Sequence, residues 1–108
     1  MKESKAMEIT MTRENERVHI KIMGDIDETG AEDLKRCFLG LDTIAIKEAV
    51  LDFKMVHYIG SAGIGKLLLL YKDLAIHGGK ITIEHVSKQV YDMLKVVKLD
   101  SIFNIKQA

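Results

Sequence analysis

The sequence predicts a single α/β domain that contains a mixed β-sheet, β-α crossover units and about three main helices. Segments of alternating apolar and polar residues are interspersed with segments whose apolar residues recur at helical spacing, in the order β-β-α-β-α-β-α-β. The 108 residues suffice for one hydrophobic core, so we expect one domain over residues 1–108 with its core at about 8–106. Crossover units set the later strands parallel, and the loops at the carboxyl ends of parallel strands meet at one edge where binding sites gather.

The first two elements are expected to be strands that form a hairpin. Residues 8–13 alternate weakly, and from Arg17 onward apolar and polar residues alternate over 17–23, with a polar turn at 14–16 between them. His19 falls on the polar side of the second strand, which predicts a solvated histidine and not a ligand or a base.

A loop over Asp25–Gly30 then leads into a helix expected at about 28–41. Ala31, Leu34, Phe38 and Leu41 lie on one helical face. Thr29 or Glu28 is expected at the amino-terminal end of this helix, while Asp25 and Asp27 suit turns and helix capping. The two aspartates have no third ligand nearby, which argues against a metal site or an acid–base pair.

The rest of the chain predicts three more strands and two more helices. Strands are expected at 48–53 and 80–84, a last extended segment at 101–105, and fraying at 106–108. A helix begins at Ser61 or Ala62 and ends at the glycines after His77, with 67–70 as a buried helical turn. One face of this helix is expected to hold Ile64, Leu67, Leu68, Tyr71, Leu74 and Ala75. The last helix begins near Ser87 and carries an apolar stripe of Val90, Met93, Leu94 and Val97.

Composition restricts the function. Sixteen basic residues balance sixteen acidic ones, so no overall charge attracts nucleic acid or an anionic membrane. No apolar run approaches the roughly 20 residues that a membrane span needs, and residues 1–5 lack the apolar core of a signal peptide. Cys37 is the sole cysteine and is expected to be a structural thiol. We therefore expect a soluble cytoplasmic protein with no metal or cofactor, no nucleic-acid partner and no membrane insertion.

The stretch Gly60-Ser61-Ala62-Gly63-Ile64-Gly65 is the candidate functional site. Ser61 suits the N-cap position, and the glycines allow another molecule to approach the backbone closely. A helix N-terminus also favours an anion. A serine hydroxyl there is accessible to a kinase, and phosphorylation would add about −1.5 to −2 charges to a nearly uncharged surface, enough to disrupt a docked interface.

Four other interpretations compete with phosphorylation. Ser61 can simply cap a helix. Gly60–Lys66 fits the nucleotide-binding pattern G-x-x-x-x-G-K, but Leu67 stands where that motif needs a hydroxyl for magnesium. His57 near Ser61 suggests a hydrolase, although no G-x-S-x-G elbow is present. Asp52 suggests a receiver-like phospho-accepting aspartate. Such a site requires more acidic residues after the first strand than this sequence has.

Two motifs carry a family resemblance. Residues 60–65, between a strand and a leucine-rich helix, are similar to the D-S-x-G-L-G segment of STAS-domain anti-sigma factor antagonists. Residues 24–34, Gly-Asp-Ile-Asp-Glu-Thr-Gly-Ala-Glu-Asp-Leu, resemble the G-E-L-D-x-x-x-A-x-x-L segment of that family. The resemblance covers nearly all of residues 8–106 and implies a STAS-like domain. One position departs from it, because Gly60 replaces the usual Asp before the serine.

The resemblance implies a regulatory protein without catalysis of its own. It would bind a serine kinase that acts as an anti-sigma factor, be phosphorylated at Ser61 and be reset by a phosphatase. The implied partner-binding residues are Asp25, Asp27, Thr29, Ile59, Gly60, Ala62, Gly63, Ile64 and Gly65. The Gly60 departure motivates an alternative, a STAS docking module that is never phosphorylated and serves in a sensor or lipid-transport complex.

Overall fold

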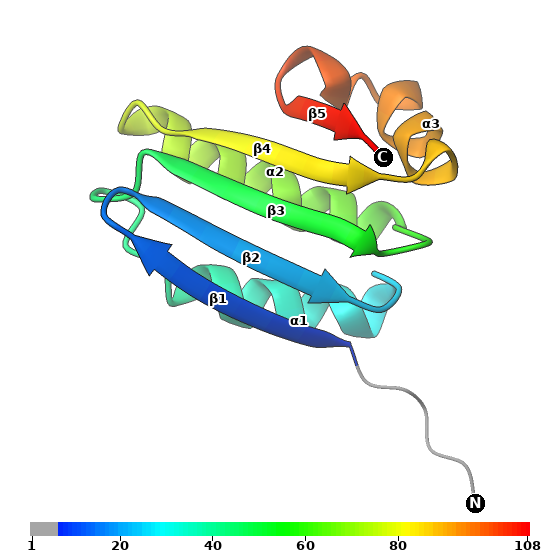
Figure 1. Cartoon of the computed structure of the whole chain (residues 1–108), viewed down its shortest axis with the longest axis horizontal. Coiled ribbons are helices and arrows are strands. Elements are labelled where there is room, and N and C mark those ends of the chain that lie inside the picture. The colour runs from blue at the N-terminus through cyan, green and yellow to red at the C-terminus, as the bar shows by residue number, and fades with distance from the viewer. Residues whose placement is uncertain (1–6) are drawn as a thin grey trace, which may run out of the picture.

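The structure, a computed structural model, describes residues 7–108. The first five residues, in which the sequence predicts no signal peptide, lie outside the described residues. Five strands form one sheet in the order β1-β2-β3-β4-β5 (Figure 1). The strands are β1 (Glu8–Glu14), β2 (Arg17–Met23), β3 (Glu48–Met55), β4 (Lys80–Val86) and β5 (Asn104–Gln107). β1 pairs with β2 antiparallel, and all later neighbours are parallel. The predicted mixed sheet is confirmed.

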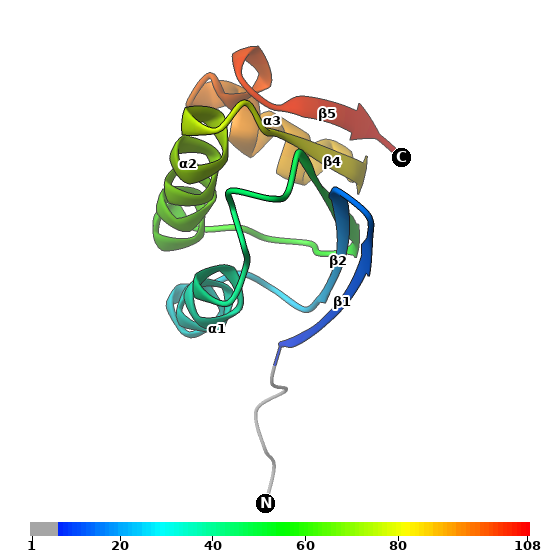
Figure 2. The same cartoon turned by 90° about the vertical axis from the view of Figure 1, so that its left-hand side faces the viewer.

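The predicted three helices are also present. They are α1 (Glu28–Leu39), α2 (Ser61–Ile76) and α3 (Lys88–Val96), followed by a 3₁₀ turn η1 (Leu99–Ser101). Figure 2 shows α1 and α2 side by side on one face of the sheet. α1 is two residues shorter than expected, because the N–H of Gly40 donates to the carbonyl of Cys37 and the N–H of Leu41 donates to the carbonyl of Phe38, and these tighter i→i−3 bonds end the helix.

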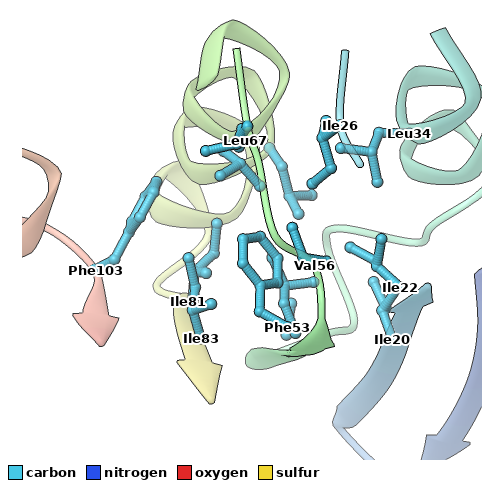
Figure 3. Close-up of a cluster of buried hydrophobic side chains, with 14 of the residues drawn as sticks. Ile20, Ile22, Ile26, Leu34, Phe53, Val56, Leu67, Ile81, Ile83 and Phe103 are labelled. Atoms are coloured by element: carbon cyan, nitrogen blue, oxygen red, sulfur yellow. The ribbon is translucent and has the colours of Figure 1, made fainter. Parts of the chain in front are cut away.

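The core lies between the sheet and its helices. β2 alternates as predicted, with Val18, Ile20 and Ile22 buried and the residues between them exposed. β3 is buried on both faces at its centre, as its continuous apolar run indicates. Figure 3 shows the centre of the core, where side chains of the sheet meet those of α1, α2 and the loops that precede them. The labelled residues are Ile20, Ile22, Ile26, Leu34, Phe53, Val56, Leu67, Ile81, Ile83 and Phe103.

The predicted inner face of α2 is partly wrong. Leu67 and Leu70 are buried, whereas Leu68 is 39% exposed and Leu69 is 55% exposed. Ala75 is exposed too. Four consecutive residues cover more than a full turn of a helix, so only some of them can face the sheet. The run 67–70 is therefore not a wholly buried turn.

The carboxyl-terminal segment also differs from expectation. Instead of an extended segment over 101–105, the chain forms the η1 turn and enters β5 at Asn104. Residues 106 and 107 belong to this strand, and the N–H of Ala108 donates to the carbonyl of Val86 at 3.0 Å. The expected fraying of 106–108 is wrong, because pairing with β4 holds the segment.

Candidate functional site

Two loops lie side by side at the carboxyl ends of β2 and β3. Ile26 and Ile59 form a parallel bridge between the loops. The N–H of Ile26 donates to the carbonyl of Tyr58 at 2.8 Å, and the N–H of Gly60 donates to the carbonyl of Ile26 at 2.9 Å. The predicted proximity of the Asp25–Thr29 segment and the Ile59–Gly65 segment is thereby confirmed, and we call the second segment the serine turn.

The sequence suggested that Ser61 is the N-cap of α2. In the structure Ser61 is instead the first residue of the helix. Gly60 takes the N-cap position with extended backbone angles, φ −96° and ψ −179°, and no side chain caps the helix. The cause is geometric, since the N-cap is the last non-helical residue and the chain already turns helical at Ser61. The side chain of Ser61 is exposed. Its hydroxyl is therefore accessible and not used for capping.

The glycines of the serine turn have different roles. A Cβ on Gly63 would lie 2.5 Å from Cγ2 of Ile26 and 3.0 Å from Cγ1 of Ile59, so α2 approaches the neighbouring loop as closely as it does only because residue 63 has no side chain. A Cβ on Gly65 would meet nothing within 4 Å. Gly63 thus serves packing, whereas Gly65 leaves its surroundings open.

The loop before α1 is closed by its own side chain. Asp27 is the N-cap of α1, and its carboxylate accepts a hydrogen bond from the N–H of Gly30 at 2.8 Å. The capping role suggested for Asp27 is confirmed, and the expectation that Thr29 or Glu28 occupies that end is corrected, because both are already helical. Asp25 and Thr29 are exposed beside the serine turn.

The predicted contact residues fall into three groups by exposure. Asp25, Asp27, Thr29 and Ser61 are exposed, and Gly60, Ala62, Ile64 and Gly65 are partly exposed. Ile59 and Gly63 are buried; the Ile59 side chain is only 2% exposed and belongs to the core. A direct side-chain contact between Ile59 and a partner is therefore not available in this structure, and Ile59 instead positions the turn.

Tyr58 is a surface residue that the sequence analysis missed. Val56 and Ile59 in the segment 55–59 are buried, but Tyr58 is 42% exposed and Met55 is 46% exposed. The Tyr58 hydroxyl lies 2.9 Å from the position that a Cβ on Gly60 would occupy. The sequence signal for this arrangement is the large side chain of Tyr58 two residues before Gly60, which has no side chain.

The geometry does not favour a phospho-accepting role for Asp52. Asp52 lies within β3, where it accepts hydrogen bonds from the N–H of Lys54 at 2.9 Å and pairs with Nδ1 of His85 at 3.1 Å. Burial alone would raise the pKa of Asp52, but these bonds outweigh it and lower the pKa. Asp52 is thus engaged in the sheet, away from the serine turn. Across residues 7–108, no cluster of three potential metal ligands occurs, and no helix is long and apolar enough to cross a membrane.

Cys37 is half-buried, as expected for a structural thiol. Its Sγ lies 3.4 Å from Sδ of Met11 on β1. Burial raises the pKa of the Cys37 thiol, which disfavours the reactive thiolate.

Solved structures with a similar fold include anti-sigma factor antagonists. An antagonist from Mycobacterium paratuberculosis has a TM-score of 0.82 at 17% identity, over 95% of this chain and 87% of that one. The antagonist SpoIIAA in its unphosphorylated form has a TM-score of 0.71 at 18% identity, over 95% and 89%. The Bacillus cell fate determinant SpoIIAA in its phosphorylated form has a TM-score of 0.68 at 18% identity, over 93% and 90%. Likeness at these identities shows the fold.

The family follows from the sequence match. The model of the STAS domain family matches residues 8–108, which is nearly the whole chain. The match spans both the loop that holds Asp25 and the serine turn. This chain belongs to the STAS domain family.

Proposed function

We propose that this chain is a regulatory protein like the anti-sigma factor antagonists, which binds a serine kinase acting as an anti-sigma factor and is switched by phosphorylation at Ser61. The observation that carries the proposal is the exposed Ser61 side chain on the first residue of α2, where no side chain caps the helix. Four backbone N–H groups at a helix start lack intrahelical partners and favour an anion. A phosphoryl group on Ser61 would enter this environment.

The unmodified turn suits a docked protein. No side chain from Tyr58 to Gly65 carries a charge, and small residues flank Ser61 on both sides. A partner can therefore approach the backbone closely without burying an unpaired charge. Asp25, Asp27 and Thr29 lie on the adjoining loop and would form the rim of the contact, with the side chain of Ile59 excluded.

The switch acts through added charge. The kinase would transfer the γ-phosphoryl group of ATP to Oγ of Ser61; the new Oγ–P bond replaces the P–O bond to ADP, and a base of the kinase takes the hydroxyl proton. About −1.5 to −2 charges then sit in the middle of the interface, next to the carboxylates of the neighbouring loop, and the partner dissociates. A phosphatase would restore the hydroxyl by hydrolysis and release inorganic phosphate. This chain would be the substrate in the cytoplasm and supply no catalysis.

The test is phosphorylation by purified kinases. Each serine kinase of the source organism would be incubated with the protein, ATP and Mg²⁺, and intact mass would be followed by peptide mapping. We expect one added phosphate, located between Tyr58 and Lys66, and its loss in Ser61→Ala. Ser101→Ala is the matched control, since Ser101 is also exposed but its hydroxyl donates to the carbonyl of Lys98 at 2.7 Å. Absence of label with every kinase, or label at another residue, would contradict the proposal.

Gly60 favours one alternative function. The family's acidic residue before the serine is missing, so a STAS module that docks in a sensor or lipid-transport complex and never carries phosphate is the second candidate. Ser61→Ala separates the two in cells that contain the partner. A switch would lose its phosphorylation-dependent release, whereas a passive docking module would behave as the wild type.

A further inference from the structure

The side chain of Tyr58 lies over the backbone of Gly60. Its hydroxyl oxygen lies 2.9 Å from the Cβ position of residue 60, and its Cε2 and Cζ lie 3.4 and 3.5 Å from that position. The phenol therefore occupies the space beside Ser61 that a side chain at residue 60 would take. Tyr58 as a whole is 42% exposed.

Ile26 fixes this arrangement through the backbone. Its N–H donates to the carbonyl of Tyr58, and its carbonyl accepts from the N–H of Gly60. Both residues are thus held by one residue of the neighbouring loop, and Ile59 between them is anchored in the core. The backbone of Tyr58 is thus held next to the start of α2.

We propose that the Tyr58 hydroxyl is the side-chain group that holds the phosphoryl group on Ser61, and this inference rests on the proposed function. Consecutive Cα atoms are about 3.8 Å apart. The hydroxyl lies beside residue 60, which directly precedes Ser61, and the proposal places it against a phosphoryl oxygen on Ser61. A phenolic O–H can donate a hydrogen bond, and bonds to charged oxygens are stronger than bonds between neutral groups.

A neutral donor has a specific use in these surroundings. The carboxylates of Asp25, Asp27 and Glu28 belong to the adjoining loop and the start of α1, while His57 and Lys66 flank the serine turn on the chain. The carboxylates disfavour a phosphate dianion, and His57 and Lys66 favour it when protonated. Tyr58 stabilises the dianion without placing a positive charge in the turn, so the unmodified surface stays neutral for a docked partner.

The experiment needs no kinase, because phosphoserine can be incorporated at position 61 during translation. Phosphorus NMR would then give the second pKa of the phosphate in the whole protein. A hydrogen bond from Tyr58 stabilises the dianion and lowers this pKa, so Tyr58→Phe should raise it by about 0.3 to 1 pH unit. Tyr58→Phe keeps the ring and every charged group listed above, which isolates the hydroxyl. Tyr71→Phe is the control, ten residues or about 15 Å further along the helix.

A second pair of variants tests the geometry. Gly60→Ala places a methyl group 2.9 Å from the Tyr58 hydroxyl oxygen, which is too close, so the ring must shift and the phosphate pKa should rise as in Tyr58→Phe. Gly65→Ala adds a methyl group that meets nothing within 4 Å and should leave this pKa unchanged. An unchanged pKa in Tyr58→Phe would overturn the inference, as would equal shifts in Tyr58→Phe and Tyr71→Phe.

The outcomes for this inference and for the proposed function are separable. A pKa shift in Tyr58→Phe supports the role of the hydroxyl even where no kinase phosphorylates Ser61, because the phosphate was supplied by translation. Labelling of Ser61 by a kinase together with an unchanged pKa in Tyr58→Phe supports the switch and refutes the role of Tyr58.

Discussion

The loops that precede α1 and α2 are neighbours, but only the loop before α1 ends in a residue whose side chain caps the helix. The loop before α1 closes on itself, because the Asp27 carboxylate binds the N–H of Gly30. The loop before α2 ends at Gly60, which has no side chain to cap the helix. In the first loop the fold uses the polar group at the helix start; in the second it leaves the helix start and the Ser61 hydroxyl available to another molecule.

The difference does not come from separate mobility of the loops. Ile26 and Ile59 join them by a parallel bridge, and both residues are buried. Within one packed unit, the loop before α1 therefore stabilises its helix by capping, and the loop before α2 leaves its helix start accessible. Substitutions at four residues test this difference, in order of decreasing change in the free energy of unfolding.

Gly63→Ala should be the most damaging change. Its Cβ would lie 2.5 Å from Cγ2 of Ile26, in the contact that joins the two loops. Overpacking of this kind costs about 1 to 3 kcal/mol, and we expect a decrease in the free energy of unfolding of about 2 kcal/mol. Urea unfolding would measure it. Wild-type stability in this variant would show that the two loops are not tightly packed.

Asp27→Ala should remove the cap of α1. Loss of an N-cap side chain costs about 1 kcal/mol, and Asp27→Asn should retain most of it because the amide oxygen also accepts a hydrogen bond. Urea unfolding of the two variants distinguishes capping from a pure charge effect. If Asn proved as damaging as Ala, the hydrogen bond to Gly30 would not be the cause.

Gly65→Ala should act in the opposite direction. Residue 65 is inside α2, and a methyl group there meets no other atom within 4 Å. Alanine is more stable than glycine inside a helix by about 0.5 to 1 kcal/mol, so the free energy of unfolding should rise by that amount. Thermal unfolding would detect it as a higher Tm. Destabilisation would mean that this side of the turn is more crowded than its geometry indicates.

Ser61→Ala should have the smallest effect on stability. Ser61 caps nothing, so the free energy of unfolding should stay within about 0.5 kcal/mol of the wild type. Urea unfolding next to Asp27→Ala gives the direct comparison of the two helix starts. A loss of about 1 kcal/mol, typical of a missing cap, would show that the Ser61 hydroxyl serves the fold after all.

The sequence predicted the fold and the proximity of the two loops well. Alternation in β2 and the helical spacing in α1 identified their inner faces, and the parallel order of the strands placed the two loops together. These features depend on periodicity and connection rules, which act over many residues.

The remaining details depend on single contacts that no local pattern encodes. Ser61 and Gly60 are both good N-cap residues, and only the backbone angles decide between them. The four leucines over 67–70 point to all sides of the helix. Packing against the sheet, and not the sequence pattern, therefore decides which of them are buried. Tyr58 follows the end of β3, so strand alternation no longer determines whether its side chain is buried or exposed. Its position depends on the path of the loop after the strand.

The double hydrogen bond to Ile26 has a consequence for association. A partner that engages the serine turn meets a backbone already in its final conformation, so little entropy is lost in ordering this chain. Binding strength can then come from a small contact area. For the same reason, the proposed phosphorylation of Ser61 would displace the partner, because the backbone beneath the serine is already fixed by these two hydrogen bonds.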